Sequence, residues 1–259
     1  MSLPQTLAAA RPIANGFAAD IPHDWMQGRT TYGGFSAALA LAAAQRANCG
    51  LPPLRSATVN FVGPLAGTVA VTTRVLRRGR NATWVGAEVA GEAGVGLTAT
   101  FVFMGAVESR LHLSESTPPA GWCSPETATA LPEHPNVPAF ITQFERRFAT
   151  PRSDKPQPVL SWWVRARDIA GLDPMVHLML VADALPPAVL PLIGGPAPVS
   201  SMTWLINLLT PAPVSRGDWW LVHAAANYAE NGCSSQDMAI WDADGRPVSA
   251  GMQSMAVFG

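Results

Sequence analysis

One acidic residue stands where it could act as a base. Asp183 follows the apolar stretch Met175–Ala182. A carboxylate enclosed by apolar helix and sheet has a raised pKa, because burial disfavours its charged form. Such a group accepts a proton near neutral pH, as the activation of a water molecule for hydrolysis requires. Asp183 also precedes Ala-Leu-Pro-Pro, so a purely structural role at the end of a helix stays open.

Other catalytic arrangements are poorly supported. The five histidines include no pair at i and i+4, and most are expected to be surface or satisfied core residues. His23-Asp24 is a candidate pair at the edge of a site. No serine lies in a G-x-S-x-G motif, which disfavours a Ser-His-Asp hydrolase. The three cysteines lack C-x-x-C spacing, which argues against a zinc site and a disulfide framework.

The charge balance argues against large anionic partners. Only 14% of the 259 residues are charged, and the formal net charge is −1. No basic face is therefore expected to bind nucleic acid or anionic lipid. The longest apolar stretches are interrupted by polar residues and prolines, and the N-terminus lacks a basic stretch followed by an apolar core. We therefore predict no membrane span, no signal peptide and a cytoplasmic location.

The first structural unit is predicted to be a helix wrapped by strands. Residues 33–46 are apolar on the whole helical circumference, so protein must enclose this helix on most sides. A flat sheet would cover only one face of the helix, whereas a curved sheet can cover most of its sides. Residues 55–62, 67–78, 82–92 and 94–105 are rich in Val, Thr and Phe, with short turns between them. This spacing predicts antiparallel hairpins.

A second unit repeats the pattern. A strand over 159–167 precedes a helix that Asp173 caps, with Pro174 at its first position, and that runs to about Ala184. Strands follow at about 199–210, 218–230, 234–243 and 246–258, the last two joined by a tight hairpin at 242–245.

The two units match in sequence as well as in pattern. Asn60 and Pro64 recur as Asn207 and Pro211 at the same separation of 147 positions. The proline-rich segment between the units is predicted to be a linker, with one short strand near 140–148. We therefore expect an α+β fold with an N-terminal repeat at 1–110, a linker at 111–158 and a C-terminal repeat at 159–259.

This organisation resembles the hotdog fold, and more narrowly the double-hotdog acyl-CoA thioesterases of the TesB type. The resemblance covers most of the chain and is weakest in the linker. Tyr32-Gly33-Gly34 is similar to the aromatic-Gly-Gly that opens the first helix of that family. Residues 61–64 (FVGP) and 77–81 (RRGRN) are similar to its strand-turn signatures.

The resemblance implies three catalytic residues. Asp183, Ser201 and Gln253 match the positions that orient the attacking water in the family. Ser201 lies ten residues before Pro211, and Gln253 lies eight residues after Gly245. The chain departs from the family at Thr203-Trp204, where some relatives carry Asp-His, and at Thr210, where Arg is common.

The implied activity is hydrolysis of an acyl-CoA to a free acid and CoA, without metal or redox cofactor. Ser201 and Gln253 each offer a donor and an acceptor to hold the water. A backbone N–H at Val176, two helical turns before Asp183, is the expected donor to the thioester carbonyl. Further substrate-binding candidates are Gly33 and Gly34 at the helix start and Arg77, Arg78 and Arg80 as partners of the CoA phosphates. By itself, the glycine pair more simply permits close packing of helix and sheet.

Two other functions stay open. One is a hotdog enoyl-CoA hydratase or dehydratase, although the Asp and His pair of those relatives is not at the expected junction. The other is a non-catalytic acyl-CoA-binding hotdog protein. The nine tryptophans are expected to be core or interface anchors, and we expect a homodimer or a higher homo-oligomer.

Overall fold

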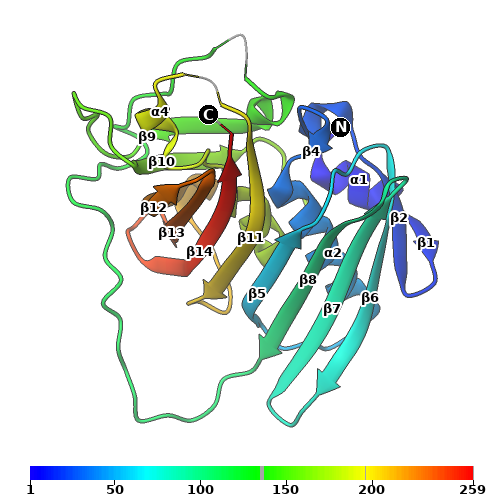
Figure 1. The fold of residues 1–259 in the computed structure, drawn as a ribbon. Coiled ribbons are helices and arrows are strands. Elements are labelled where there is room, and N and C mark those ends of the chain that lie inside the picture. The colour runs from blue at the N-terminus through cyan, green and yellow to red at the C-terminus, as the bar shows by residue number, and fades with distance from the viewer. Residues whose placement is uncertain (135–136, 196, 259) are drawn as a thin grey trace.

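A single antiparallel sheet of twelve strands runs through the molecule (Figure 1), in the order β1-β2-β6-β7-β8-β5-β11-β14-β13-β12-β10-β9. The structure is a computed structural model that describes residues 1–134, 137–195 and 197–258. Within these residues, no helix is both long and apolar enough to cross a membrane. The predicted α+β architecture, with curved sheet around helices, is confirmed.

The first half of the sheet encloses helix α2 (Gly33–Ala47), which is buried at every position from 34 to 44. Its strands are β1 (Arg11–Ile13), β2 (Gly16–Asp20), β5 (Leu54–Phe61), β6 (Thr68–Arg78), β7 (Ala82–Gly91) and β8 (Gly94–Met104). Val59, Val71, Val85 and Phe101 all face the helix and are fully buried. This alternation of buried and exposed residues is what pleated strands with one covered face require.

The second half repeats this arrangement around helix α3 (Pro174–Ala182). Asp173 caps α3, since its carboxylate accepts from the N–H groups of Met175 and Val176. The strands are β9 (Phe144–Phe148), β10 (Val159–Ala166), β11 (Val199–Leu208), β12 (Trp220–Glu230), β13 (Cys233–Trp241) and β14 (Pro247–Val257). The hairpin between β13 and β14 closes through Gly245, whose positive φ of 79° suits a glycine.

Strands β5 and β11 join the two halves edge to edge. Ser56 pairs with Asn207, and Asn60 pairs with Thr203. Ser56 and Thr203 are separated by the same offset as Asn60 and Asn207, so each pair is the repeat equivalent of the other. Strands β5 and β11 are therefore related by a local twofold axis, and the repeated residues Asn60 and Asn207 lie at the seam between them.

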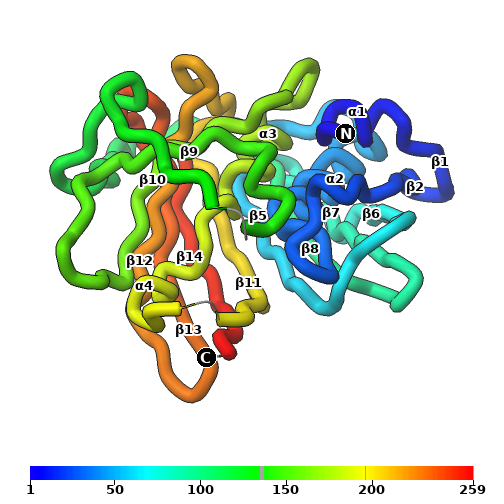
Figure 2. Tube along the Cα trace, turned by 90° about the horizontal axis from the view of Figure 1, so that it is seen from above, coloured from blue at the N-terminus to red at the C-terminus, as the bar shows by residue number. Residues whose placement is uncertain are grey.

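The two helices also meet beneath this seam (Figure 2), and both belong to one hydrophobic core. The hydroxyl of Tyr32, just before α2, donates a 2.7 Å hydrogen bond to the carbonyl of Leu180 in α3. Because Tyr32 is almost fully buried, this bond fixes the start of α2 against the end of α3.

The segment between the halves covers the outer face of the second half. A second, smaller core packs there, with Trp163, Leu221 and Trp241 from the sheet against Ala128 and Ala149 from the connecting segment. Within the part of the chain that the structure describes, no comparable second core packs on the outer face of the first half, so the two halves are unequal.

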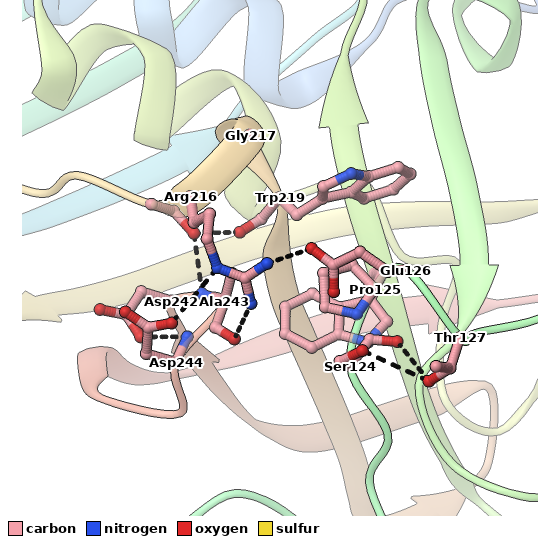
Figure 3. A network of polar contacts seen from close by, with 12 residues as sticks. Ser124, Pro125, Glu126, Thr127, Arg216, Gly217, Trp219, Asp242, Ala243 and Asp244 are labelled. Carbon is pink, nitrogen blue, oxygen red and sulfur yellow. Dashed lines mark hydrogen bonds and ion pairs between the residues drawn. The ribbon is translucent and has the colours of Figure 1, made fainter.

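Polar contacts hold the connecting segment in place (Figure 3). Arg216 binds the carboxylates of Glu126, in the connecting segment, and Asp244, in the β13–β14 turn. The hydroxyl of Ser215 accepts from the N–H of Ala243 at 2.8 Å and donates to the carbonyl of Trp219. The segment is thus anchored to the turn opposite the seam.

The predicted helices and strands recur within two residues at each end, except that the strand expected near 140–148 begins only at Phe144. The sequence did not predict the shorter elements, which include α1 (Leu3–Ala9), β1, β2 and α4 (Leu190–Ile193), and β1 and β2 extend the first half of the sheet. The short strand expected near 140–148 is β9, preceded by the turn η2 (Ala139–Gln143). The remaining small elements are η1 (His23–Trp25), β3 (Met26–Gln27), β4 (Thr30–Thr31) and η3 (Arg216–Asp218).

Candidate active site

Asp183 lies at the junction of the two halves. It is the C-cap of α3, directly after the last helical residue, and Pro186-Pro187 prevents the helix from continuing. Its side chain points toward the start of α2 and toward β14. The end of the helix from the second half therefore presents its carboxylate to the beginning of the helix from the first half.

The three predicted catalytic residues lie in hydrogen-bond contact. The side-chain Nε2 of Gln253 donates to Asp183 Oδ1 at 2.8 Å and to Ser201 Oγ at 3.1 Å. Ser201 lies on β11 and Gln253 on the neighbouring β14. A carboxylate and a hydroxyl bridged by one carboxamide form a polar cluster large enough to hold a water molecule.

Glycines at the start of α2 allow the carboxylate to come close. A Cβ at Gly33 would lie only 2.6 Å from Asp183 Oδ2 and 2.8 Å from the ring of Phe61. A Cβ at Gly34 would lie 2.5 Å from the hydroxyl of Tyr32. The backbone of Gly34 also hydrogen-bonds the Asp183 carboxylate. The first turn of α2 thus directs its N–H groups and positive dipole end at this acid.

Burial nonetheless dominates the electrostatics of Asp183. Removal from water raises the pKa of the carboxyl from 3.8 to about 7, while the hydrogen bonds from Gln253 and Gly34 act in the opposite direction. The raised value places the acid where it is partly ionised at neutral pH. That is the range in which a general base both accepts and returns protons effectively.

The cluster is open on one side. Gln253 is only 3% exposed, whereas Asp183 and Ser201 are half-buried, as are the neighbouring Gly33 and Phe61. The amide is therefore enclosed, while the carboxylate and the hydroxyl keep an accessible edge. Water or a substrate can reach the two groups that would act on it.

The structure does not bring Val176, the predicted oxyanion donor, into this cluster. Val176 lies in the first turn of α3, two turns from Asp183, and its N–H donates to the carboxylate of Asp173. The sequence argument overlooked that the N-cap it identified would occupy this donor. The N–H groups beside Asp183 belong to α2.

The structure also places the three arginines predicted to bind CoA phosphates away from the carboxylate. They are Arg77, Arg78 and Arg80, and all are exposed. Their turn adjoins Met104 at the end of β8, whereas Phe61, beside Gly33, pairs with Leu97 near the start of β8. Along a strand this separation is roughly 20 Å. They do not contribute to the cluster itself.

Two cavities lie elsewhere. A cleft of about 580 Å³ opens on the outer face of the first half, beside Asn60 and Arg74, and does not include Asp183. A second cavity, with about 10 Å³ of free space, is enclosed between the end of α3 and the sheet, beside Trp204 and Gly251. The second has room for about one water molecule. Neither cavity includes the Asp183 carboxylate. The candidate site is therefore identified by the hydrogen-bonded side chains and not by a cavity.

Three of the histidine positions can be placed by their contacts. Asp24, beside His23, pairs with the N-terminal amine of Met1 at the surface. His223 hydrogen-bonds Ser161 at 2.8 Å. His177 is buried and, among the described residues, its Nε2 has no partner, so it is an exception to the expectation that most histidines are surface or satisfied core residues. Burial lowers the pKa of His177 to about 4.

The sequence argument missed one polar residue beside the cluster. Gln236 on β13 pairs in register with Gln253 and donates to its Oε1 at 3.1 Å. A signal for it was present in the sequence, because Gln236 and Met238 share the inward face of their strand. A glutamine among inward-facing residues marks a buried polar contact.

Comparison with protein-family models places both halves in the same family. Residues 21–104 match the acyl-CoA thioesterase N-terminal domain, and residues 124–257 match the acyl-CoA thioesterase C-terminal domain. The comparison with curated proteins returned no match.

Solved structures share the fold along the whole chain. A hot dog fold protein of unknown function from Alicyclobacillus acidocaldarius is 19% identical, with a TM-score of 0.87 and coverage of 100% of this chain and 99% of that chain. The TesB protein from Mycobacterium avium subspecies paratuberculosis is 20% identical, with a TM-score of 0.79 and full coverage of both chains. The acyl-CoA thioesterase II TesB2 from Mycobacterium marinum is 17% identical, with a TM-score of 0.78 and coverage of 100% and 99%.

These likenesses show the double hotdog fold. The family models span the helix and sheet of each half and include Asp183, Ser201 and Gln253. The chain belongs to the acyl-CoA thioesterase family.

Proposed function

We propose that the protein hydrolyses acyl-CoA thioesters by direct attack of water, with Asp183 as general base. The observation that carries this proposal is the convergence of Asp183, Ser201 and Gln253 from three separate elements on one half-exposed point. A carboxylate with a pKa of about 7 beside two groups that can orient water has the elements of general-base hydrolysis.

The reaction proceeds in two stages. Asp183 accepts a proton as water oxygen bonds to the thioester carbon, and the carbonyl oxygen becomes an oxyanion. The carbon–sulfur bond then breaks, the carbonyl re-forms as the free acid, and CoA leaves as a thiolate that takes up the proton. The N–H of Gly33, in the first turn of α2 beside Asp183, replaces Val176 as the proposed donor to this oxyanion. The next N–H groups are already used, since that of Gly34 bonds Asp183 and those of Phe35 and Ser36 bond the carbonyl of Tyr32.

Broader assignments follow from the family. Membership implies an acyl-CoA substrate, and we propose that Arg77, Arg78 and Arg80 contact the phosphates at the nucleotide end of CoA, away from the reacting carbon. We also propose a homodimer or higher homo-oligomer located in the cytoplasm. The absence of a cofactor requirement stays a prediction.

The proposal is tested by thiol release from a panel of acyl-CoA esters of different chain length. We expect the wild type to release CoA from at least one ester and Asp183→Asn to lose about 100-fold or more in kcat, because no base remains. Asp237→Asn is the matched control, since Asp237 is exposed on β13 and its carboxylate accepts a surface hydrogen bond from the side chain of Asn227.

Each alternative gives a different result. Acyl-CoA binding without thiol release would indicate a non-catalytic binding protein, and hydration of an enoyl-CoA with the thioester intact would indicate a hydratase. Full activity of Asp183→Asn on every ester that the wild type cleaves would contradict the mechanism.

A further inference from the structure

Gln236 is the most deeply buried side chain attached to the candidate site. It is 0% exposed, on β13, and so it cannot touch a substrate or bulk water. A buried carboxamide is costly unless both of its ends are hydrogen-bonded. Both ends of Gln236 are bonded, one to the backbone N–H of Ala188 and one to Gln253.

The bonds of Gln236 follow one direction. The N–H of Ala188 donates to Gln236 Oε1 at 2.9 Å, and Gln236 Nε2 then donates to Gln253 Oε1 at 3.1 Å. Gln253 Nε2 in turn faces Asp183 and Ser201. A backbone N–H can only donate, so the first bond decides the orientation of Gln236, and Gln236 decides that of Gln253.

Orientation matters because the two ends of a carboxamide have nearly the same shape. Packing alone does not distinguish them, and hydrogen-bond partners must do so. A reversed Gln253 would place its oxygen against the Asp183 carboxylate and remove the donor that the carboxylate accepts. In the observed orientation Ser201 Oγ accepts from Gln253, which leaves the serine hydroxyl proton for water or substrate.

The donor that starts this chain is itself held firmly. Ala188 follows Pro186-Pro187, whose rings fix φ and stiffen the segment that leaves Asp183. Ala188 is fully buried. The segment from Asp183 to Ala188 therefore has two effects. It carries the carboxylate, and through Gln236 it fixes which end of the Gln253 amide faces that carboxylate.

We propose that Gln236 is a positioning residue for thioester hydrolysis, which orients the carboxamide of Gln253 toward Asp183 and Ser201. This inference rests on the proposed function, since it assigns the orientation of that site's amide. Gln236 acts through Gln253 and has no contact with the reacting atoms.

The sharpest test is Gln236→Glu. Burial raises the pKa of the new carboxyl group, so the effect develops as this group ionises. The carboxylate then still accepts from Ala188, but its second oxygen faces Gln253 Oε1, so Gln253 must reverse its amide. Asp183 then loses a donor and faces an oxygen instead. We expect the acid limb of the kcat profile to move up by about one pH unit, because the charged form of Asp183 is less stabilised. We expect kcat at pH 7 to fall about 10-fold or more, with KM within about 2-fold of the wild type.

Gln236→Met provides the test if a buried glutamate prevents folding. It keeps the length of the side chain and removes both hydrogen bonds, so Gln253 is free to adopt either orientation. We expect a loss of about 5-fold in kcat with KM unchanged. The control is Ser234→Ala, on the same inward face of β13, whose hydroxyl has no partner among the described residues. It should leave the kcat profile unchanged.

A measurement without substrate separates this proposal from the proposed function. The Asp183 carboxyl is titrated by carbon-13 NMR, with its signal assigned by comparison with Asp183→Asn. An upward shift of its pKa in folded Gln236→Glu or a broadened titration in Gln236→Met supports the orienting role, even if the wild type releases no thiol. If the wild type is active, an unchanged titration together with an unchanged kcat profile in a folded variant would overturn it. If the wild type is inactive, an unchanged titration in a folded variant would overturn it.

Discussion

At Asp183, burial and hydrogen bonding act in opposite directions on one carboxylate. Enclosure by α2, α3 and the sheet raises its pKa, whereas the donors of Gln253 and Gly34 lower it, and burial prevails. An acid with more donors would stay ionised and be a weak base, and one with none would stay protonated. The number of hydrogen-bond donors to Asp183 therefore sets the pKa of its carboxyl group.

The raised pKa of Asp183 predicts a specific pH dependence of stability. The folded state binds this proton more tightly than the unfolded chain, so the contribution of Asp183 to stability falls as pH rises from about 4 to about 7. Asp183→Asn removes this loss. We expect the variant to gain roughly 1–3 kcal/mol over the wild type at pH 8 relative to pH 4.5, given ~1.4 kcal/mol per pKa unit and partial exposure.

The measurement is urea unfolding of both proteins at the two pH values. A difference between the variant and the wild type that does not depend on pH would show that the pKa of Asp183 is not raised by folding.

At the scale of elements, the start of α2 places the site. The helix approaches Asp183 closely because residues 33 and 34 lack side chains. The sequence analysis interpreted this pair as part of a helix-opening motif that contacts substrate. The structure adds a second requirement, since the carboxylate from the other half occupies the space that a Cβ at Gly33 would need.

Gly33→Ala tests this requirement. The new methyl group would meet Asp183 Oδ2 at 2.6 Å, so the carboxylate must move from its position beside Gln253 and Ser201. We expect kcat to fall about 10- to 100-fold, as for other small displacements of catalytic groups. Gly105→Ala is the control, since its Cβ would lie 3.9 Å from the nearest atom. Equal kcat values for the two variants would contradict the packing argument.

At the scale of the whole molecule, the two halves form one sheet and share one core. The main hydrophobic core includes Val59 and Phe101 from the first half and Trp204 and Val222 from the second. At the seam, residues 56–60 of β5 pair with residues 203–207 of β11. Neither half can lose its structure without exposing surface of the other.

We therefore predict a single cooperative unfolding transition. Phe101→Ala, in the first half, should destabilise the protein by about 3–5 kcal/mol. Seven of the nine tryptophans lie after residue 120, so fluorescence reports mainly on the second half. We expect Phe101→Ala to lower the urea midpoint seen by fluorescence as much as the midpoint seen by circular dichroism.

Leu221→Ala, on the outer face of the second half, is the matching variant and should likewise shift both midpoints together. A fluorescence midpoint unaffected by Phe101→Ala would show that the halves unfold independently. The division at residues 110 and 158 stays a prediction.

The sequence by itself determined most of the elements and singled out Asp183 as the candidate acid. A helix apolar on all sides requires a sheet that wraps it, and alternating strands require one buried face, so α2, α3 and most strands followed from periodicity. Asp183 stood out because an acid after an apolar helix is unusual. Ser201 and Gln253 came from the resemblance to a family, since each is an ordinary strand residue by itself.

Only the tertiary structure decided which groups meet. The strand pairing β5–β11 brings the start of one helix to the end of the other, and periodicity carries no information about that long-range pairing. For the same reason the sequence analysis assigned the oxyanion donor to the helix that carries Asp183, whereas the neighbouring N–H groups belong to α2. The bonds from Ala188 through Gln236 to Gln253 likewise depend on the register of β13 against β14, which is set when the sheet assembles.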